Sequence, residues 1–230
     1  MNQVNSRWNN WINRWQNMLD AVTKMGGAAD DLIIEPPATL QQVEEIEHGL
    51  GIHLPISFRK TMLDFSAKIE FSWSLPEDDK LTIPLPSEFS GIFRGNCSWN
   101  LNNMIDINRD KDEWVKAVFP NPDDPYDKVW HHKLAFHEVG NGDYLAFDLA
   151  NGPDCPVVYL SHDGGEGHGY ILGNNFIDLM ERWTRVGCPG AEDWQMLPFI
   201  SSPTSGIESD GGNAFKWREW LNQVSNNLTN

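Results

Sequence analysis

The sequence predicts an α+β fold, in which helices pack against a mostly antiparallel, twisted sheet. Apolar residues recur at helical spacing near both ends of the 230-residue chain, whereas its middle holds short apolar runs separated by Pro and Gly. An order of helices, then strands, then helices is typical of α+β proteins. With 40% hydrophobic residues and 11 Trp, the chain is able to build a full hydrophobic core, and we expect a single domain with appendages.

An amphipathic helix is predicted from about residue 6 to Met25, where Gly26 and Gly27 end it. Its apolar stripe consists of Trp8, Trp11, Trp15, Leu19 and Val22. A stripe of Trp is also able to stack on sugars or bases, but this spacing favours a seam that faces the core.

Two further helices are predicted before the first strand. The first starts after Thr39, where Gln42 completes a capping box, and ends at Gly51. The second opens near Ser57. We expect it to turn Phe58, Met62, Phe65 and Ile69 inward.

The middle and the end of the chain alternate strands with helices. The strand candidates are Phe71–Leu75, Leu81–Leu85, Gly91–Asn96, Leu134–Val139, Tyr144–Leu149 and Pro156–Leu160. A helix is predicted over Asn103–Phe119, followed by an acidic loop, Pro120–Lys128. A second helix, Asn174–Val186, is expected to bury Trp183 in the core. Beyond the connecting segment Gly187–Asn213, a last helix is expected to carry Phe215, Trp220, Leu221, Val224 and Leu228.

The charge of the chain excludes several classes of partner. Asp and Glu number 33 against 17 Lys and Arg, so the formal net charge is −16, and no Lys or Arg occurs from Leu134 to Glu181. Such a field repels phosphate backbones and anionic lipids and attracts basic proteins. We therefore expect a basic protein partner, no nucleic acid and no membrane.

The sequence also indicates where the protein resides. No window approaches the ~18 apolar residues of a membrane span, and the first residues lack a signal-peptide pattern. Cys97, Cys155 and Cys188 are far apart and form no CxxC motif, which is typical of reduced thiols. We expect a cytoplasmic protein.

The stretch Val157–Tyr170, VVYLSHDGGEGHGY, places two His, an Asp and a Glu within seven residues. These side chains bind metals or move protons. We interpret the stretch as a strand followed by a Gly-rich loop, because four glycines do not hold ligands rigidly. The open alternative is a metal site in which His131, His132 and His137 approach His162 across the sheet. No metal and no cofactor are expected.

Catalytic signatures are missing from the chain. There is no GxSxG elbow, no GxGxxG or GxxxxGK[ST] phosphate loop, and no Cys in a catalytic context. A glycosidase needs two carboxyl groups at a fixed separation, which sequence does not show. We predict that the protein is not an enzyme. A metal-dependent or glycoside hydrolase is kept as an alternative hypothesis for its function.

A set of motifs in a fixed order resembles a known superfamily. The helix-loop-helix LQQVEEIEHGLGIHLPISFRKTML follows the register of the pattern hxxhExxhGhxLPxxY/FxxFh, where h is hydrophobic, with Val43, Ile46, Glu47, Leu50, Gly51, Leu54, Pro55, Phe58 and Leu63. Later motifs are the strand Val139, Gly140, Gly142, Asp143, Tyr144 and Asp148, the run Val157 to His162, and the closing helix with Phe176, Leu179 and Trp183. Together they resemble the SUKH superfamily, which includes the fungal cell-wall-assembly regulator and many bacterial toxin-immunity proteins.

The resemblance divides the chain into three segments and implies a function. Residues 1–35 form a Trp-rich helical extension, 36–186 a SUKH-like domain, and 187–230 a linker with the last helix. The first hypothesis for function is a non-catalytic immunity protein that covers a cognate toxin, often a nuclease in this family. The second is a regulatory scaffold like the fungal members.

Acidic residues in loops and on helix surfaces are the candidates for binding a basic partner. They are Glu77, Asp78, Asp79, Asp110, Asp112, Glu113, Asp123, Asp124 and Asp127, with Asp163 and Glu166 in the Gly-rich loop. Charge reversal at Asp123 and Asp124 is expected to slow association with a basic toxin and to leave thermal stability almost unchanged.

Overall fold

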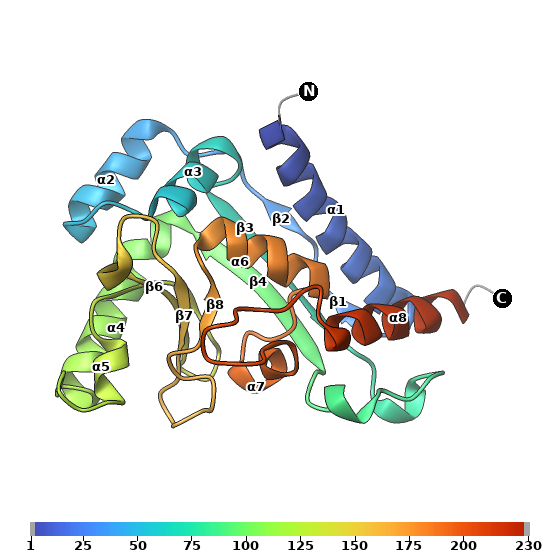
Figure 1. Ribbon diagram of the computed structural model, residues 1–230. Helices are drawn as coiled ribbons and strands as arrows, with labels where there is room; N and C mark the ends of the chain where they lie inside the picture. Colours follow the sequence, from blue (N-terminus) through green and yellow to red (C-terminus); the bar gives the residue numbers. More distant parts are fainter. Residues whose placement is uncertain (1–2, 228–230) are drawn as a thin grey trace.

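The computed structural model of the chain describes residues 3–227 and confirms the α+β fold (Figure 1). The helices are α1 (Gln3–Lys24), α2 (Leu40–Leu50), α3 (Ile56–Asp64), α4 (Met104–Val118), α5 (Asp127–Trp130), α6 (Phe176–Trp183), α7 (Asp193–Met196) and α8 (Gly212–Asn227). The strands are β1 (Ala28–Ala29), β2 (Ile33–Ile34), β3 (Lys68–Ser74), β4 (Arg94–Asn100), β5 (Lys133–Glu138), β6 (Tyr144–Asp148), β7 (Val157–Leu160) and β8 (Ile171–Gly173).

The strands form two antiparallel sheets of four strands each. In the first, β3 pairs with β4 along its whole length and with β1 and β2 on its other edge. The second is the meander β5-β6-β7-β8. Strands β4 and β5 are neighbouring edges of the two sheets, and a side chain of β5 bonds to β4 between them. This junction is the place where a pocket forms.

The cap of α2 confirms the local prediction for this helix. Thr39 Oγ1 accepts a hydrogen bond from the Gln42 backbone N–H at 3.2 Å, and Gln42 Oε1 accepts one from the Thr39 N–H at 2.8 Å. Gly51 ends the helix at φ +70°, a conformation that costs glycine little.

Two expectations about individual segments are wrong. Leu81–Leu85 is not a strand, since Pro84 lacks the N–H that a ladder needs, and the carbonyls of Ile83 and Pro84 instead face Trp220 Nε1 of α8. Ile69 lies in β3 and not in α3, which ends at Asp64. Phe215 lies in α8 as expected, and its side chain is 59% exposed. Leu228 lies outside the described residues.

Some boundaries also differ from the prediction, and some short elements were not predicted. Strand β4 runs over Arg94–Asn100 instead of Gly91–Asn96. The sequence did not predict β1, β2, β8, α5 or α7, each of which has four residues or fewer. Elements of this length have too little periodicity to be recognised in a sequence.

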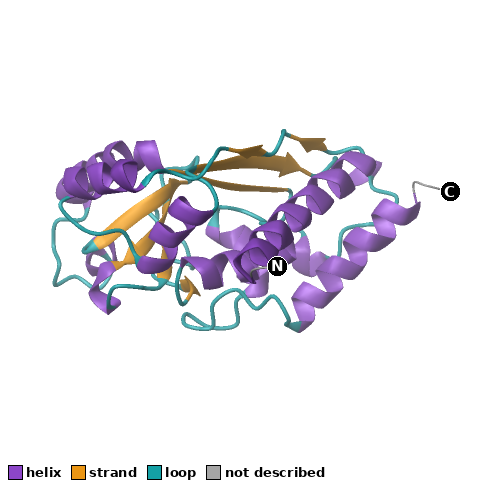
Figure 2. Cartoon of the chain, turned by 90° about the horizontal axis from the view of Figure 1, so that it is seen from above, coloured by secondary structure: helices purple, strands orange, loops and turns teal. Residues whose placement is uncertain are grey.

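The helix α1 is part of the main core. Trp8, Trp11 and Trp15 are at most 4% exposed, and all three rings pack against Phe65. Trp217 of α8 is fully buried in the same core cluster. Figures 1 and 2 show α1 and α8 side by side at one end of the molecule, with α4 at the other. The first and last helices therefore share one core with the residues between them, and the proposed boundaries at residues 35 and 186 stay a prediction.

Within residues 3–227, no helix combines the length and the apolar character that crossing a bilayer requires.

Candidate functional site

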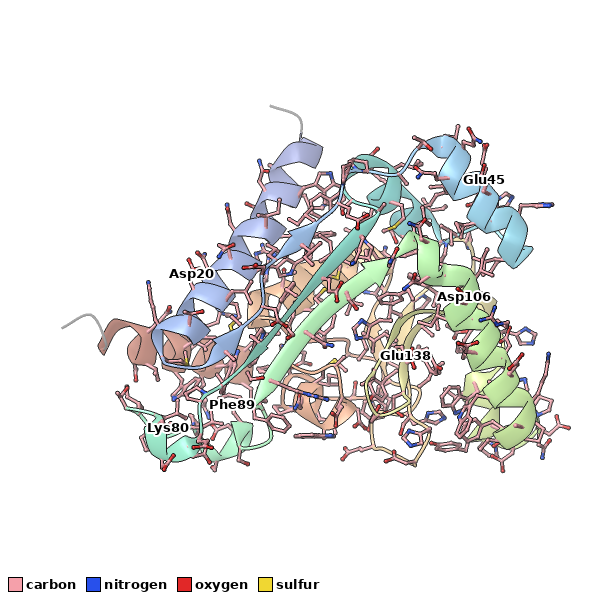
Figure 3. The ribbon with its side chains drawn as sticks, turned by 180° about the vertical axis from the view of Figure 1, so that it is seen from behind. Asp20, Glu45, Lys80, Phe89, Asp106 and Glu138 are labelled. Atoms are coloured by element: carbon pink, nitrogen blue, oxygen red, sulfur yellow. The ribbon has the colours of Figure 1, made fainter. Side chains whose placement is uncertain are left out.

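The acidic clusters expected to bind a partner do not form one surface. Glu77, Asp78 and Asp79 are exposed at a 3-10 turn, where Glu77 pairs with Lys80 at 2.7 Å. Figure 3 places Lys80 at the opposite end of the molecule from Asp106 of α4. A compact partner that covers α4 does not reach this turn.

The carboxylates of the Pro120–Lys128 loop have structural roles. Asp124 Oδ1 accepts hydrogen bonds from the backbone N–H groups of Tyr126 and Asp127, at 2.8 and 3.1 Å. Asp127 Oδ2 accepts one from the Asn121 N–H at 3.0 Å. Asp123 is exposed. Two of these three side chains therefore hold the loop that leads into α5.

The carboxylates of α4 differ in their surroundings. Asp112 pairs with the buried Lys111 at 2.7 Å, and Glu113 is exposed on the outer face of the helix. Asp110 lines a pocket between α4 and the junction of the two sheets. Among the expected residues, Asp110 alone lines this pocket.

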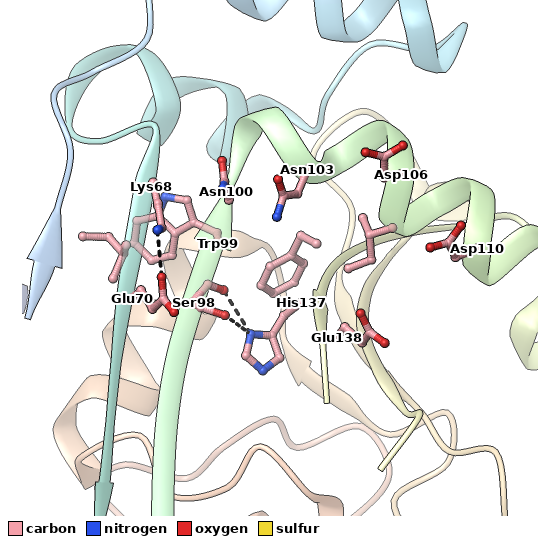
Figure 4. Close-up of a pocket in the computed structure, with 13 residues that line it drawn as sticks. Lys68, Glu70, Ser98, Trp99, Asn100, Asn103, Asp106, Asp110, His137 and Glu138 are labelled. Carbon is pink, nitrogen blue, oxygen red and sulfur yellow. Dashed lines mark hydrogen bonds and ion pairs between the residues drawn. The ribbon is translucent and has the colours of Figure 1, made fainter. Parts of the chain in front are cut away.

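The pocket has a volume of about 390 Å³ and draws on β3, β4, β5 and the start of α4 (Figure 4). Its lining residues are Lys68, Ile69, Glu70, Ser98, Trp99, Asn100, Asn103, Asp106, Ile107, Asp110, Phe136, His137 and Glu138. Sites for small ligands typically measure about 300 to 1,000 Å³, so this pocket fits a small ligand or a side chain.

The ion pairs around the pocket leave it negatively charged. Lys68 Nζ lies 2.8 Å from Glu70, and this contact raises the pKa of Lys68. Arg109, which lies outside the lining, pairs with Asp106 at 2.8 Å and with Asp110 at 3.2 Å. Glu138 is exposed and has no ion pair within the described chain. Four carboxylates against two basic side chains leave two negative charges.

Nearby groups respond to this charge. Burial raises the pKa of Tyr144, and the carboxylates of Glu138 and Asp110 raise it further. Both carboxylates therefore raise the pKa of the same residue, although Glu138 lies on β5 and Asp110 on α4. The negative potential is a property of the pocket and not of one side chain.

A β-bulge places His137 at the junction. The β5–β6 register shifts between Ala135 and His137, so the strand gains one residue there. Bulges re-aim side chains. The ring of His137 turns to β4, where Nδ1 lies 2.8 Å from Ser98 Oγ and 3.1 Å from the Ser98 carbonyl oxygen. Figure 4 shows both contacts.

The protonation state of His137 follows from these contacts. A carbonyl oxygen only accepts, so Nδ1 carries the proton and donates to Ser98. Burial lowers the pKa of His137 to about 4, so the ring is neutral at pH 7. Its Nε2 is then a bare acceptor, and no group in the described chain bonds to it. A buried acceptor without a partner is rare and needs an explanation.

The four glycines predicted a loop that is not held rigidly. In the structure, close packing and hydrogen bonds hold the Gly-rich loop in place. A Cβ on Gly165 or Gly167 would lie 2.5 or 2.6 Å from Asp193, so both positions require glycine for close packing. The N–H of Gly167 donates to Asp193 Oδ2 at 2.8 Å. Asp163 and Glu166 are exposed on this loop, and the hydroxyl of Ser161 donates to Asp163.

Asp143, His162 and Asp163 are close enough together to hold a cation, with one ligand atom from each within 4.8 Å of the others. Two of these side chains already have partners. Asp143 Oδ1 lies 2.6 Å from His162 Nδ1, and Asp143 Oδ2 accepts the Tyr159 hydroxyl at 2.6 Å. Burial and the bond to Asp143 raise the pKa of Tyr159 well above its usual value. These bonds explain the arrangement without a metal, and the expected lack of a metal site stays a prediction.

His137 and His131 form their hydrogen bonds with groups other than His162. His137 bonds to β4, and His131 Nε2 lies 2.9 Å from the Phe119 carbonyl oxygen. Sequence reasoning considered His137 as a metal ligand and missed Glu70, Asp106 and Glu138. A signal was present, because His137 is a polar residue inside the apolar run LAFHEV.

Glu47, one of the motif residues, has a structural role. Its side chain is 6% exposed, and Oε1 accepts a hydrogen bond from the Leu54 backbone N–H at 3.0 Å. Arg59 of α3 donates to the same oxygen at 3.0 Å. Glu47 therefore links α2, the Leu54-Pro55 turn and α3.

These helices, followed by β3 and β4 and later by the β5–β8 meander and α6, define an α+β domain of the kind that the sequence resembles. The model of the SMI1 / KNR4 family (SUKH-1) matches residues 37–182, and the chain belongs to this family. No curated protein and no solved structure matches the chain.

Proposed function

We propose that this protein is a non-catalytic immunity protein, which neutralises a basic cognate toxin in the cytoplasm by covering its active surface. The observation that carries the proposal is the negatively charged pocket at the start of α4. Membership of the SUKH-1 family supports a protein partner in general, and the chemistry of the pocket supports a basic one.

An exposed aromatic side chain next to the pocket supports protein binding. Trp114 is 42% exposed and lies one helical turn beyond Asp110, so both side chains project from the same side of α4. Val118, 43% exposed, follows one turn later. Trp is enriched at the centres of protein interfaces. We define the α4 surface as the pocket together with Trp114 and Val118.

Charge and apolar area have separate roles on the α4 surface. Nucleases that grip phosphates have basic clefts, and the carboxylates of the pocket imitate the phosphates. Exposed charges mainly raise the rate of association, and salt at 0.15 M screens them over about 8 Å. Burial of Trp114 mainly slows dissociation.

A toxin encoded beside this gene is the partner to test first. We expect the chain to restore growth of cells that produce the toxin, and the purified proteins to associate faster at low salt. The double variant Asp110→Lys with Glu138→Lys should slow association at low salt. Asp78→Lys with Asp79→Lys introduces the same charge at the far end of the molecule and is the matched control.

Two results would contradict the proposal: no restored growth with any neighbouring toxin, or equal association rates in low and high salt for the wild type. A neutral or acidic partner that binds the α4 surface would favour the regulatory scaffold.

A further inference from the structure

Another pocket lies between α1 and α8, at the end of the molecule away from α4 (Figures 1 and 2). Its volume is about 210 Å³, and three arginines line it: Arg14 of α1, Arg185 of the 3-10 turn Thr184–Val186, and Arg218 of α8. Among the described residues, no carboxylate belongs to this lining. The chain has 33 Asp and Glu against 17 Lys and Arg, so this pocket has the opposite charge character to the rest of the protein.

The ion pairs around the pocket leave one positive charge without a counterion. Arg14 pairs with Glu181 at 3.0 Å, and Arg185 pairs with Asp210 at 2.8 Å. Arg218 is half-buried and has no ion pair within the described residues. Three guanidinium groups against two carboxylates leave a charge of +1.

The three guanidinium groups also keep hydrogen-bond donors that the chain does not use. Each guanidinium has five N–H donors. The hydrogen bonds that Arg14 makes to other residues all use Nη1. Arg185 and Arg218 also donate through Nη1 alone, to Asp210 and to the Ser209 carbonyl oxygen. Within residues 3–227, Nε and Nη2 of all three arginines therefore have no acceptor, and a ligand that binds them must bring acceptors and negative charge.

The arrangement of the arginines separates the possible anions. They come from three elements, so the oxygens that accept their hydrogen bonds must point in several directions. A phosphate group is tetrahedral and offers three or more acceptor oxygens, whereas a carboxylate is planar and offers two. Arginine also binds phosphate with two parallel hydrogen bonds. Sites for whole small ligands start at about 300 Å³, so a pocket of about 210 Å³ fits a phosphate group and leaves the rest of its molecule in solvent.

We propose that this pocket binds a phosphate group, either inorganic phosphate or the phosphate of a small phosphorylated metabolite. The guanidinium groups of Arg14, Arg185 and Arg218 donate to its oxygens. The exposed amides of Asn17 and Asn222 line the same pocket and offer further N–H donors. A bound phosphate then joins the first helix of the chain to the last.

The net charge of −16 does not prevent this binding. At 0.15 M salt, exposed charges more than about 8 Å away are largely screened, so the charges at the pocket determine the affinity. The site lies away from the α4 surface, and the proposal goes beyond the proposed function without depending on it.

The test is a titration of the full chain with inorganic phosphate, followed by NMR, at constant ionic strength with chloride as the balancing anion. We expect saturable shifts of the Nε–H resonances of Arg14, Arg185 and Arg218. Acetate should bind at least about tenfold more weakly, since it offers fewer acceptors for charge-assisted hydrogen bonds. Glycerol 3-phosphate distinguishes the two sources of the group. If it binds at least as tightly as inorganic phosphate, the ligand is a metabolite, and weaker binding assigns the site to the free ion.

A first pair of variants tests the arginine without an ion pair. Arg218→Gln should weaken phosphate binding at least about tenfold, because it removes the charge that the chain does not neutralise. Lys216→Gln is the matched control. It removes the same charge from α8, but residues two apart on a helix do not face the same way, and Lys216 pairs with Glu88 outside the pocket. Its binding of phosphate should be unchanged.

A second pair does not depend on the folding of Arg218→Gln, which loses the hydrogen bond to Ser209. Asn222→Asp places a carboxylate in the lining and should weaken phosphate binding at least about tenfold through repulsion. Gln223→Glu makes the same exchange at the next residue, outside the lining, and should leave binding unchanged. Both side chains are exposed, so both variants are expected to fold.

Three outcomes would overturn the proposal. The absence of saturable shifts, or shifts confined to other regions, would show that the pocket does not hold phosphate. Equal binding of acetate would show that the phosphate group is not recognised. Equal losses for Asn222→Asp and Gln223→Glu would show that phosphate responds to the overall charge and not to the pocket.

Discussion

Glu47 and Leu54 are joined by a hydrogen bond in which the Leu54 backbone N–H donates to Oε1 of Glu47 at 3.0 Å. Burial acts to raise the pKa of Glu47, but the bond from Leu54 and the contacts with His53 and Arg59 outweigh it and lower the pKa. A carboxyl group whose pKa is lowered on folding stabilises the protein above its unfolded pKa. This contribution is lost as the pH falls through the folded pKa.

Glu47→Gln should therefore reduce the free energy of unfolding by about 2 kcal/mol at pH 7, since a hydrogen-bonded ion pair is lost. The difference from the wild type should shrink at pH 3, because the contribution of the wild-type carboxyl group is lost as the pH falls through its lowered pKa. Urea unfolding at both values measures it. Glu45→Gln, at an exposed position of α2, is the control, and an equal loss at both pH values would contradict the prediction.

Trp183→Ala tests the core. Trp183 is 1% exposed, and its indole N–H donates to the Pro189 carbonyl at 2.9 Å. Truncation should cost about 3–5 kcal/mol of unfolding free energy. Trp114→Ala, at the exposed α4 surface, should change stability by no more than about 0.5 kcal/mol. Thermal or urea unfolding of both variants measures these two losses. A larger loss for Trp114→Ala than for Trp183→Ala would contradict the prediction.

The buried His137 predicts acid sensitivity. Burial lowers its pKa from 6.5 to about 4, so below pH 6.5 the unfolded chain binds a proton that the folded chain does not. Stability should therefore fall by about 3 kcal/mol between pH 6.5 and 4 through this residue. An NMR titration should show a neutral His137 ring at pH 5. Protonation of this ring near pH 6.5 would show that the junction is open to water.

Asp123 and Asp124 are adjacent carboxylates with different expected effects. Asp123→Lys should leave stability nearly unchanged, because the side chain is exposed. Asp124→Lys should lose about 1 kcal/mol, because its carboxylate accepts two backbone hydrogen bonds. This revises the expectation that reversal at both sites leaves stability unchanged. Equal melting temperatures for the two variants would refute the role of Asp124.

Elemental analysis of the purified, untagged protein should find no stoichiometric metal. The reason is that Asp143 and His162 use their facing atoms on each other and Asp143 also binds Tyr159. Stoichiometric zinc or iron that disappears in His162→Ala would establish a metal site at Asp143, His162 and Asp163.

Local signals predicted much of the fold. Thr39 and Gln42 form their capping box within four residues, and β6 and β7 differ from their predicted ranges by one residue at one end. The strand-like composition of Leu81–Leu85 was misleading, because no neighbouring strand pairs with it. Strands β1 and β2 form because they pair with one edge of β3. A pattern of two residues does not predict this pairing.

The candidate site was less predictable than the fold. Its carboxylates come from β3, α4 and β5, and the two sheets must meet before Glu70 and Glu138 line one pocket. Sequence predicted Asp110 because an acidic helix surface is a local feature. It did not predict the bulge at Phe136, which is set by pairing with β6 and determines where His137 points.

The packing of α1 has a consequence during synthesis. The indole N–H of Trp11 donates to Glu181, which lies 170 residues later in the chain. At about 5–20 residues per second, Glu181 is made about 10–30 s after Trp11. Until then the tryptophans of α1 lack part of their final surroundings on the nascent chain. The order of synthesis therefore delays completion of this part of the core until residue 181 has been made.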